Sequence, residues 1–246
     1  MNILSIDTTT KVASVAIYKN DKIIENSISN EITHSEKLLP LIDSTLKEAN
    51  LTIKDINIHA TINGPGSFTG IRIGLATLKA FSMIDGKNIF SMPSTTIMAY
   101  KSYVENIVNN FSTPTYVASL IDARNDRVYY SLNKIYKDNN NKVHIEEILN
   151  TSNELINSSL DKIYYALKDI NNLNVIISGD CVNNYHEKII NKINNAVIYN
   201  TYPTPSDLIN AYFNISLNNE YIFDTYTLDA TYARASQAER IRNNEK

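Results

Sequence analysis

The fold is decided by the stretch Gly64-Pro65-Gly66-Ser67-Phe68-Thr69-Gly70-Ile71-Arg72-Ile73-Gly74, which holds four of the six glycines of this 246-residue chain. It lies between an expected strand at 53–62 and an expected helix at 71–83. Backbone N–H groups and the helix dipole at such a turn favour an anion. Alternatively, the glycines only supply backbone angles and permit close helix packing. The residues themselves fit both interpretations.

The spacing of the glycines excludes two common phosphate-binding motifs. No Lys-Ser/Thr pair follows the last glycine, as a Walker A loop requires. The spacing of Gly64, Gly66 and Gly70 is one residue too long for a dinucleotide fingerprint. Arg72 opens the expected helix, where its charge opposes the helix dipole, so we expect an acidic group to face it from within the fold or from a partner.

The residues before this stretch predict a three-stranded meander followed by a helix. The expected strands span residues 2–7, 12–18 and 22–29. Thr33 and Glu36 form a capping box, and apolar residues then recur at helical spacing over 35–49. We expect Pro40 to kink this helix or to confine its regular part to one side.

A similar pattern begins again after the first lobe, which we expect to end with a helix at 94–109. Strands are expected at 116–122, 127–134, 142–148 and 175–178, and helices at 154–168 and 205–217. Asp122 ends the first of these strands as Asp7 ends the first strand of the chain, 115 residues earlier (122 − 7). Such a duplication predicts two lobes of one topology. Because β-meanders are common, chance recurrence is the alternative.

This organisation divides the chain into three parts. The expected parts are an N-terminal lobe at 1–112, a second lobe at 113–217, and a closing segment at 218–246 that is helical and packs back toward the first lobe.

Composition narrows the classes of function. With 23 basic and 26 acidic residues, the chain lacks the basic excess of a stand-alone nucleic-acid binder. One cysteine, Cys181, excludes an internal disulfide framework and a cysteine-built zinc site. The four histidines form no i, i+4 pair, so we expect no metal site. Without an apolar run of about 18 residues or a signal-peptide pattern, a cytoplasmic protein away from membranes is expected.

Three β-branched residues, Thr8, Thr9 and Thr10, follow Asp7 at the end of the first strand. In actin-like ATPases and sugar kinases, the equivalent loop binds phosphate and uses glycine for close approach. Threonines make the loop stiffer and bulkier, so Asp7 is expected to cap its own loop. Any vestigial phosphate or nucleotide contact is expected from Asp7, Thr8, Thr9, Gly64, Gly66, Ser67, Thr69, Gly70 and Arg72.

The chain resembles the bacterial TsaB (YeaZ) family, partners of the TsaD enzyme that makes threonylcarbamoyladenosine in tRNA. The matching motifs are Ile3-x-x-Ile6-Asp7-Thr8, His34-Ser35-Glu36-Lys37-Leu38-Leu39-Pro40, the stretch from Gly64 to Gly74, Ser94-Thr95, Asp122-Ala123-Arg124 and Tyr232-x-Arg234-x-Ser236-Gln237-Ala238-Glu239. One departure is Ala230, where the family usually has proline before the terminal Tyr-x-Arg, which affects only the local turn.

The resemblance implies an α/β protein with the actin-like ATPase (ribonuclease H-like) fold. Two duplicated lobes, each with a mixed sheet and helices, would enclose a degenerate nucleotide cleft. Catalysis would sit in a TsaD-like subunit that this chain activates as a scaffold, so the chain itself would be no enzyme. ATP or ADP and a metal are then expected in the partner subunits rather than here. A TsaE-like ATPase and tRNA would join through the complex, and a homodimer is expected for the chain alone.

In the resembled family, the partner contacts two helices of the first lobe, which map here to residues 35–49 and 71–83. The expected contact residues are Ser35, Leu38, Leu39, Ile42, Leu46, Ile73, Gly74, Ala76, Thr77 and Ala80. Small residues along the second helix would let a partner helix approach closely. The alternative is that both helices pack only on their own sheet.

Two functions from other classes remain as alternatives. A stand-alone metalloprotease would need a histidine pair that this sequence lacks. A small-molecule kinase of the same fold would need an open phosphate loop. The crowded threonines after Asp7 disfavour such a loop.

Overall fold

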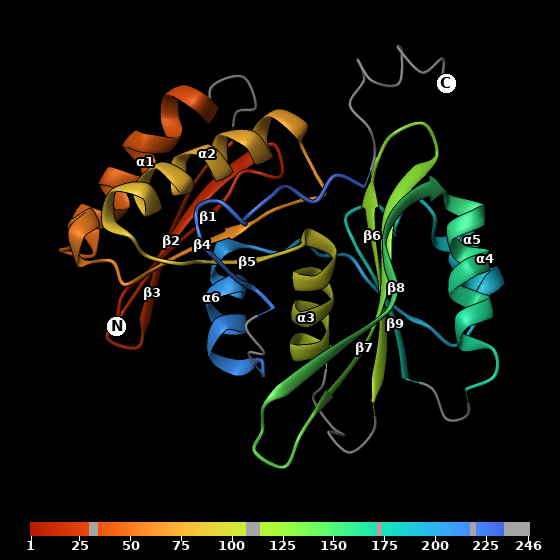
Figure 1. The fold of residues 1–246 in the computed structure, drawn as a ribbon. Helices are drawn as coiled ribbons and strands as arrows, with labels where there is room; N and C mark the ends of the chain where they lie inside the picture. Colours follow the sequence, from red (N-terminus) through yellow and green to blue (C-terminus); the bar gives the residue numbers. More distant parts are fainter. Residues whose placement is uncertain (30–33, 107–113, 171–173, 217–219, 234–246) are drawn as a thin grey trace.

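The computed structural model describes residues 1–29, 34–106, 114–170, 174–216 and 220–233. These residues form two β-sheets with helices packed on both faces of each (Figure 1). The first sheet contains β1 (Ile3–Asp7), β2 (Val12–Lys19), β3 (Lys22–Ser29), β4 (Ile58–Ile62), β5 (Ile89–Met92) and β11 (Ile222–Phe223). The second contains β6 (Thr115–Asp122), β7 (Arg127–Lys137), β8 (Val143–Leu155), β9 (Asn174–Ser178) and β10 (Val197–Tyr199). The helices are α1 (His34–Glu48), α2 (Phe68–Asp85), α3 (Ser94–Asn106), α4 (Ile156–Leu167), α5 (His186–Lys192) and α6 (Pro205–Asn214).

Both sheets have one topology. The first runs in the order β11-β5-β4-β1-β2-β3 and the second in the order β10-β9-β6-β7-β8. In each, three antiparallel strands form a meander, and its first strand pairs in parallel with the next strand along the chain. This repeat confirms the predicted two-lobed α/β fold of the actin-like type, and β11 adds one antiparallel strand to the first sheet.

Two helices lie between the sheets, and each packs across the expected lobe boundary. The helix α3 follows β5 of the first sheet but packs on β6, β7 and β9 of the second. In return, α6 follows β10 but packs on β1, β2 and β4. Lys101 of α3 joins the two helices by an ion pair with Asp207, at 3.0 Å between Nζ and Oδ2. The last helix of each expected lobe therefore lies on the sheet of the other.

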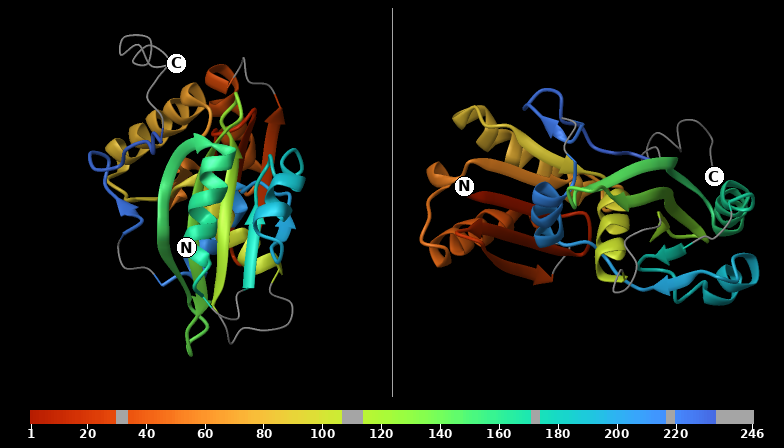
Figure 2. Two further views of the ribbon diagram at one scale, coloured as in Figure 1. Left: turned by 90° about the vertical axis from the view of Figure 1, so that its right-hand side faces the viewer. Right: turned by 90° about the horizontal axis from the view of Figure 1, so that it is seen from below.

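The remaining helices cover the outer faces. On the first sheet, α1 and α2 pack on the face opposite α6, and on the second, α4 and α5 pack opposite α3 (Figures 1 and 2). Three cores result: one between the sheets, one beneath α1 and α2, and one beneath α4 and α5. The core between the sheets joins Ile3 and Phe90 of the first sheet to Val117 and Ile176 of the second.

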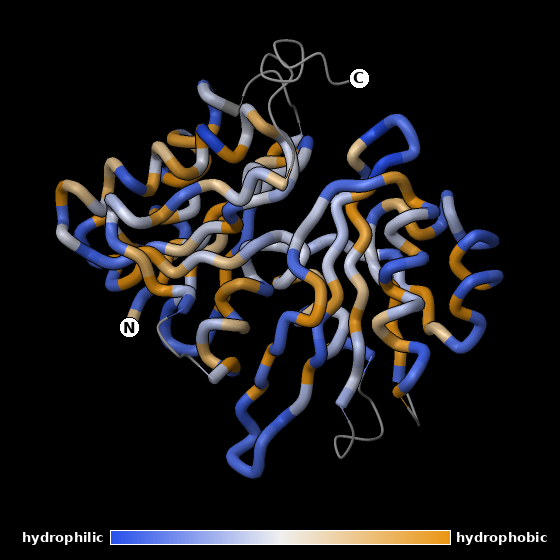
Figure 3. The backbone as a smooth tube through the Cα atoms, turned by 45° about the vertical axis from the view of Figure 1, so that its right-hand side comes forward, coloured by the Kyte–Doolittle hydropathy of each residue, from blue (hydrophilic) through white to orange (hydrophobic). Residues whose placement is uncertain are grey.

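Local sequence signals explain where the central elements begin and end. Ser67 caps α2 by accepting a hydrogen bond from the Gly70 N–H, and Gly86 ends it in the left-handed region at φ 69°. Thr204 and Asp207 form a capping box on α6 with Pro205 at its start. The polar tip between β7 and β8 projects from the second sheet (Figure 3).

Several boundaries differ from the sequence prediction. The strand expected at 53–62 splits into a short 3₁₀ turn at Ile53–Asp55 and β4, because Asp55 accepts hydrogen bonds from Thr52. β8 extends to Leu155 and takes the start of the helix expected at 154. Pro40 lies inside α1 without ending it.

The closing segment joins the first sheet through β11, and its described residues, 220–233, contain no helix. Some expected features lie outside the described residues: the cap Thr33, the helix ends at 107–109 and 217, and the tail at 234–246. Within the described part of the chain, no helix is long and apolar enough to cross a membrane.

Candidate functional site

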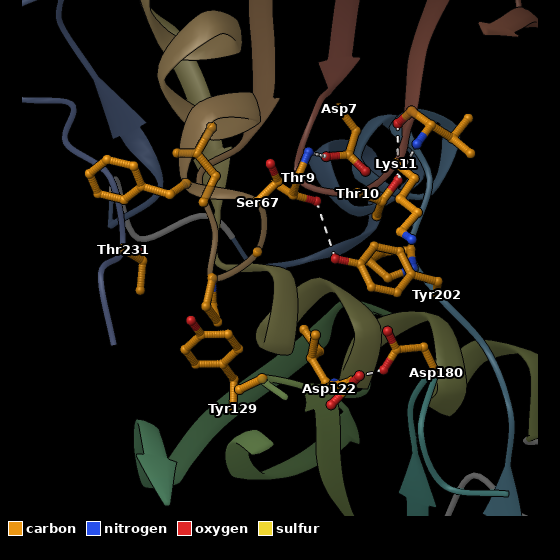
Figure 4. A pocket seen from close by; sticks show the side chains of 18 of the residues that line it. Asp7, Thr9, Thr10, Lys11, Ser67, Asp122, Tyr129, Asp180, Tyr202 and Thr231 are labelled. Atoms are coloured by element: carbon orange, nitrogen blue, oxygen red, sulfur yellow. Dashed lines mark hydrogen bonds between the residues drawn. The ribbon is translucent and has the colours of Figure 1, made fainter. Parts of the chain in front are cut away.

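A cavity of about 1100 Å³ lies between the two lobes. The loop after β1 and the Gly-rich turn line it from the first lobe, and the loop after β6 lines it from the second (Figure 4). Residues 202–204 before α6 and 231–233 of the closing segment complete the wall. Asp7 and Asp122 end equivalent strands of the two lobes, and both line this cavity.

The Gly-rich turn is filled by the threonine loop of the same chain. The Thr8 hydroxyl donates to the Gly70 carbonyl at 2.7 Å, and the Ser67 N–H donates to the Thr9 carbonyl at 2.6 Å. A Cβ at Gly70 would overlap the Thr8 carbonyl oxygen, and one at Gly66 would overlap that of Thr9. These glycines therefore allow the first loop to pack on the turn, which is the structural alternative left open by the sequence.

Asp7 lies at the inner end of this loop with only 3% of its surface exposed. Burial raises the pKa of its carboxyl to about 6, against the opposing effect of hydrogen bonds from Thr9. One of these bonds joins the Thr9 N–H to Asp7 Oδ1 at 2.8 Å, as expected for a residue that caps its own loop. The Thr9 hydroxyl in turn lies 3.2 Å from the Tyr202 hydroxyl, so the floor of the cavity is closed by residues of this chain (Figure 4).

The second lobe presents Asp122 and Asp180 to the cavity. The Asp122 N–H donates to Asp180 Oδ1 at 2.9 Å, and Asp122 Oδ1 accepts from the Arg124 N–H at 2.9 Å. Arg124 and the two residues after it all have positive φ, between 55° and 62°. Burial raises the pKa of Asp180. The turn after β6 is thus held in a left-handed conformation beside the cavity.

Sequence reasoning missed Asp180, Tyr202 and Lys11 as cavity-lining residues. The duplication contained a signal for the first. Gly179-Asp180 comes directly after β9, and Gly64 comes two residues after the end of the equivalent strand β4. A Cβ at Gly179 would overlap the Leu120 carbonyl oxygen, so the second lobe has its own close turn at this place.

Arg72 contacts a hydroxyl and two rings rather than a carboxylate. Its Nε donates to the Tyr232 hydroxyl at 2.9 Å, and its guanidinium carbon lies 3.8 Å from the centre of the Phe68 ring. The Phe68 and Tyr232 rings pack at 5.2 Å between centroids. An aromatic pair therefore takes the place of the acidic group that was expected to face Arg72 from within the fold.

The residues expected to contact a partner divide into two sets. Leu38, Ile42, Leu46 and Gly74 are buried in the core of their own lobe. Their burial corrects the prediction for these four, because the apolar side of α1 packs on β2 and β3 and Gly74 packs on Thr8. Exposed or half-buried are Ser35, Leu39, Ile73, Ala76, Thr77 and Ala80.

Two exposed apolar side chains on α2 were missed. Met83 is 66% exposed and Ile84 is 84% exposed, and both follow Ala76 and Ala80 at helical spacing. The helix was expected to end at Met83, whereas α2 continues to Asp85 and is capped by Gly86. The sequence signal for an exposed position of Met83 and Ile84 was their place one helical turn beyond Ala80.

The buried histidine and cysteine pack inside their own lobes. His59 is fully buried, with its Nε2 2.9 Å from Asp85 Oδ2, and burial lowers its pKa. The Cys181 thiol contacts the Leu120 carbonyl at 3.4 Å, and burial raises its pKa. Among the residues that the structure describes, no cluster of three His, Cys, Asp or Glu side chains could hold a metal ion.

The topology and the inter-lobe cavity define a two-lobed actin-like protein in which the threonine loop packs on the Gly-rich turn. Residues 22–212 match the model of the family described as TsaD, tRNA N6-adenosine threonylcarbamoyltransferase. The chain belongs to this family as one of its TsaB (YeaZ) members.

Curated relatives support this assignment. The chain is 39% identical over 101 residues to the tRNA threonylcarbamoyladenosine biosynthesis protein TsaB of Buchnera aphidicola subsp. Schizaphis graminum, covering 41% of this chain and 48% of that one. It is 30% identical over 147 residues to TsaB of Escherichia coli K12, covering 60% of each. These matches span about half to three fifths of each relative.

The match to solved structures extends over nearly the whole chain. YeaZ of Pseudomonas aeruginosa aligns with a TM-score of 0.70 at 18% identity, over 94% of this chain and 100% of that one. A second Pseudomonas aeruginosa structure, described as similar to peptidase YeaZ, aligns with a TM-score of 0.73 at 19% identity, covering 95% and 99%. At this identity the match supports the fold alone.

Proposed function

We propose that this chain takes part in tRNA threonylcarbamoyladenosine biosynthesis as a non-catalytic scaffold. In this role it binds and activates a TsaD-like threonylcarbamoyltransferase, which modifies adenosine 37 of tRNAs that decode ANN codons. Its relatives in Buchnera and Escherichia coli are named for this biosynthesis. A TsaE-like ATPase and tRNA join through the complex, and ATP or ADP and the metal belong to the partner subunits.

The observation that carries the proposal is the threonine loop packed into the Gly-rich turn. Because Thr8 and Thr9 bond to Gly70 and Ser67, the turn stabilises this chain's own fold. Its glycines are then needed for internal packing rather than for approach to a phosphate. A chain built in this way supports catalysis in a partner instead of performing phosphoryl chemistry itself.

The surface that supports docking is one side of α2 together with Leu39 of α1. We call it the docking face, and it consists of Leu39, Ile73, Ala76, Thr77, Ala80, Met83 and Ile84. The α2 members recur at helical spacing. Ala76, Ala80, Met83 and Ile84 are exposed, Thr77 is half-buried, and Ile73 also packs on the core beneath α1 and α2. Ala76 and Ala80 leave room for a second helix to approach closely. Such an apolar stripe also favours a homodimer when the partner is absent.

Size exclusion with light scattering tests the proposal on the full chain, alone and mixed with the TsaD-like protein of the same organism. We expect a stable heterodimer. Leu39→Asp and Ala76→Glu should each weaken it by about tenfold or more, because a charge would be desolvated against an apolar partner surface. Both positions are exposed, so the folded lobe should tolerate the change.

A matched control is Val197→Asp on β10 of the second sheet. Val197 is 55% exposed and Leu39 is 54% exposed, so the two variants differ in place rather than in burial. The control should bind like the wild type. If no complex forms at tens of micromolar, or if the docking-face variants bind as tightly as the control, the scaffold role is wrong as stated.

A further inference from the structure

The closing segment forms a strap, defined here as residues 221–232, that lies along α2 (Figures 1 and 2). It starts at the edge of the first sheet, where the Ser91 N–H donates to the Tyr221 carbonyl at 2.9 Å. Its middle is anchored by Leu228, which is fully buried in the core beneath α1 and α2. The strap therefore flanks the helix that carries the docking face.

At the C-terminal end of α2, the strap bonds to Ser82. The hydroxyls of Thr225 and Ser82 lie 2.6 Å apart, and Ser82 is 2% exposed. The Ser82 hydroxyl donates its single proton to the Lys87 carbonyl at 2.6 Å, so Thr225 must be the donor to Ser82. This chain of two bonds joins the strap, the last turn of α2 and the start of the next loop.

At the N-terminal end, the strap covers the first turn of α2. Arg72 donates to the Tyr232 hydroxyl at 2.9 Å, and the Tyr232 ring packs on Phe68. The strap also makes two hydrogen bonds to Asn63, the residue before the Gly-rich turn. The Asn63 side-chain N–H donates to the Asp229 carbonyl at 3.0 Å, and the Thr231 N–H donates to the Asn63 carbonyl at 2.8 Å. The turn and the helix start are thus fixed from one side by the strap.

The two contacts are far enough apart to orient the helix. Arg72 and Ser82 are ten residues apart, which is about 15 Å along an α-helix. The seven Cα steps from Thr225 to Tyr232 can span at most about 25 Å, so the strap is long enough to reach both contacts. A helix held at two such points can neither tilt nor rotate without breaking one of them.

We propose that Thr225 and Tyr232 are positioning residues for the docking face, and that the strap sets partner affinity by fixing the orientation of α2. The inference rests on the proposed function, since it takes the docking face as the partner's binding surface. Neither residue needs to touch the partner, because each acts through α2.

Hydrogen exchange of the full-length chain tests the positioning step without any partner. Tyr232→Ala should speed amide exchange in the first turns of α2, at residues 70–74, by about fivefold or more. Thr225→Ala should do the same in the last turn, at residues 81–85. The matched control is Tyr165→Ala on α4 of the second lobe, which removes a ring that is 61% exposed and should leave exchange in α2 unchanged.

Titration with the TsaD-like protein tests the functional step. Tyr232→Ala should weaken binding by about fivefold, and Tyr232→Phe by about twofold, because the phenylalanine keeps the ring contact with Phe68 but loses the oxygen that accepts from Arg72. The unfolding midpoint of each variant is measured alongside and should match that of Tyr165→Ala.

The possible failures are distinct. Unchanged exchange in α2 overturns the inference at its first step. Faster exchange with unchanged partner affinity overturns it at the second, because the strap would then be only structural. If the wild type fails to bind the TsaD-like protein while the exchange effects are present, the proposed function fails, and the contact between strap and helix stands.

Discussion

At the scale of single residues, the Asp7 carboxyl is a buried ionisable group at the inter-lobe cavity. Burial raises its pKa to about 6 from 3.8, and the nearby Glu25 charge acts in the same direction. The folded chain therefore holds this proton at pH values where the unfolded chain has lost it. Stability from this group is present at low pH and is lost as the pH rises from about 4 through 6.

Asp7→Asn should remove this pH dependence. The amide oxygen can still accept from the Thr9 N–H, but the side chain no longer ionises. Relative to the wild type, the free energy of unfolding of the variant should rise by about 2 kcal/mol between pH 4.5 and pH 7.5. Denaturant unfolding at the two pH values measures this. A difference that stays constant with pH would contradict the buried, protonated state of Asp7.

At the scale of elements, the threonine loop can pack closely on the Gly-rich turn only because the glycines of that turn have no side chain. Gly70→Ala should destabilise the fold by about 3 kcal/mol, because the new Cβ overlaps the Thr8 carbonyl oxygen and a backbone has to move. Gly86→Ala is the matched control. Its Cβ would meet nothing within 4 Å, so only the left-handed φ of 69° costs energy, about 1 kcal/mol. Equal losses in thermal unfolding of the two variants would refute the close packing of the first loop.

The elements also show which sequence signals were sufficient. The two meanders and the helix at the Gly-rich turn were predictable because alternation and capping are local properties. The surface that covers the apolar side of α1 was not predictable. Its residues Leu38, Ile42 and Leu46 form a stripe that suits a partner helix or its own sheet equally well. Only the packing of α1 on β2 and β3 decides between them.

At the scale of the whole molecule, the two lobes share one core. Residues of both sheets meet in it around α3 and α6, and the Lys101–Asp207 ion pair joins the two helices. Neither sheet can expose its inner face without opening the other. The lobes are therefore expected to lose their structure together.

Calorimetry of the full chain should accordingly show one unfolding transition, with equal calorimetric and van't Hoff enthalpies. Lys101→Met tests whether the lobes still unfold together without the ion pair between α3 and α6. It should lower the midpoint while keeping a single transition, because the apolar core still joins the sheets after the ion pair is lost. Two separate transitions in either protein would show that the lobes unfold independently.

The sequence by itself determined the order of the elements, the duplication and the Gly-rich turn that marks the family, because these depend on residues close together in the chain. Only the tertiary structure decided that Thr8 and Thr9 fill that turn, that α3 and α6 pack on each other's sheets, and that the strap holds α2 at both ends. Thr8 and Gly70 are 62 positions apart, and Arg72 and Tyr232 are 160 positions apart. Periodicity reports that a face is apolar, but which surface buries it depends on how the sheets and helices pack in space.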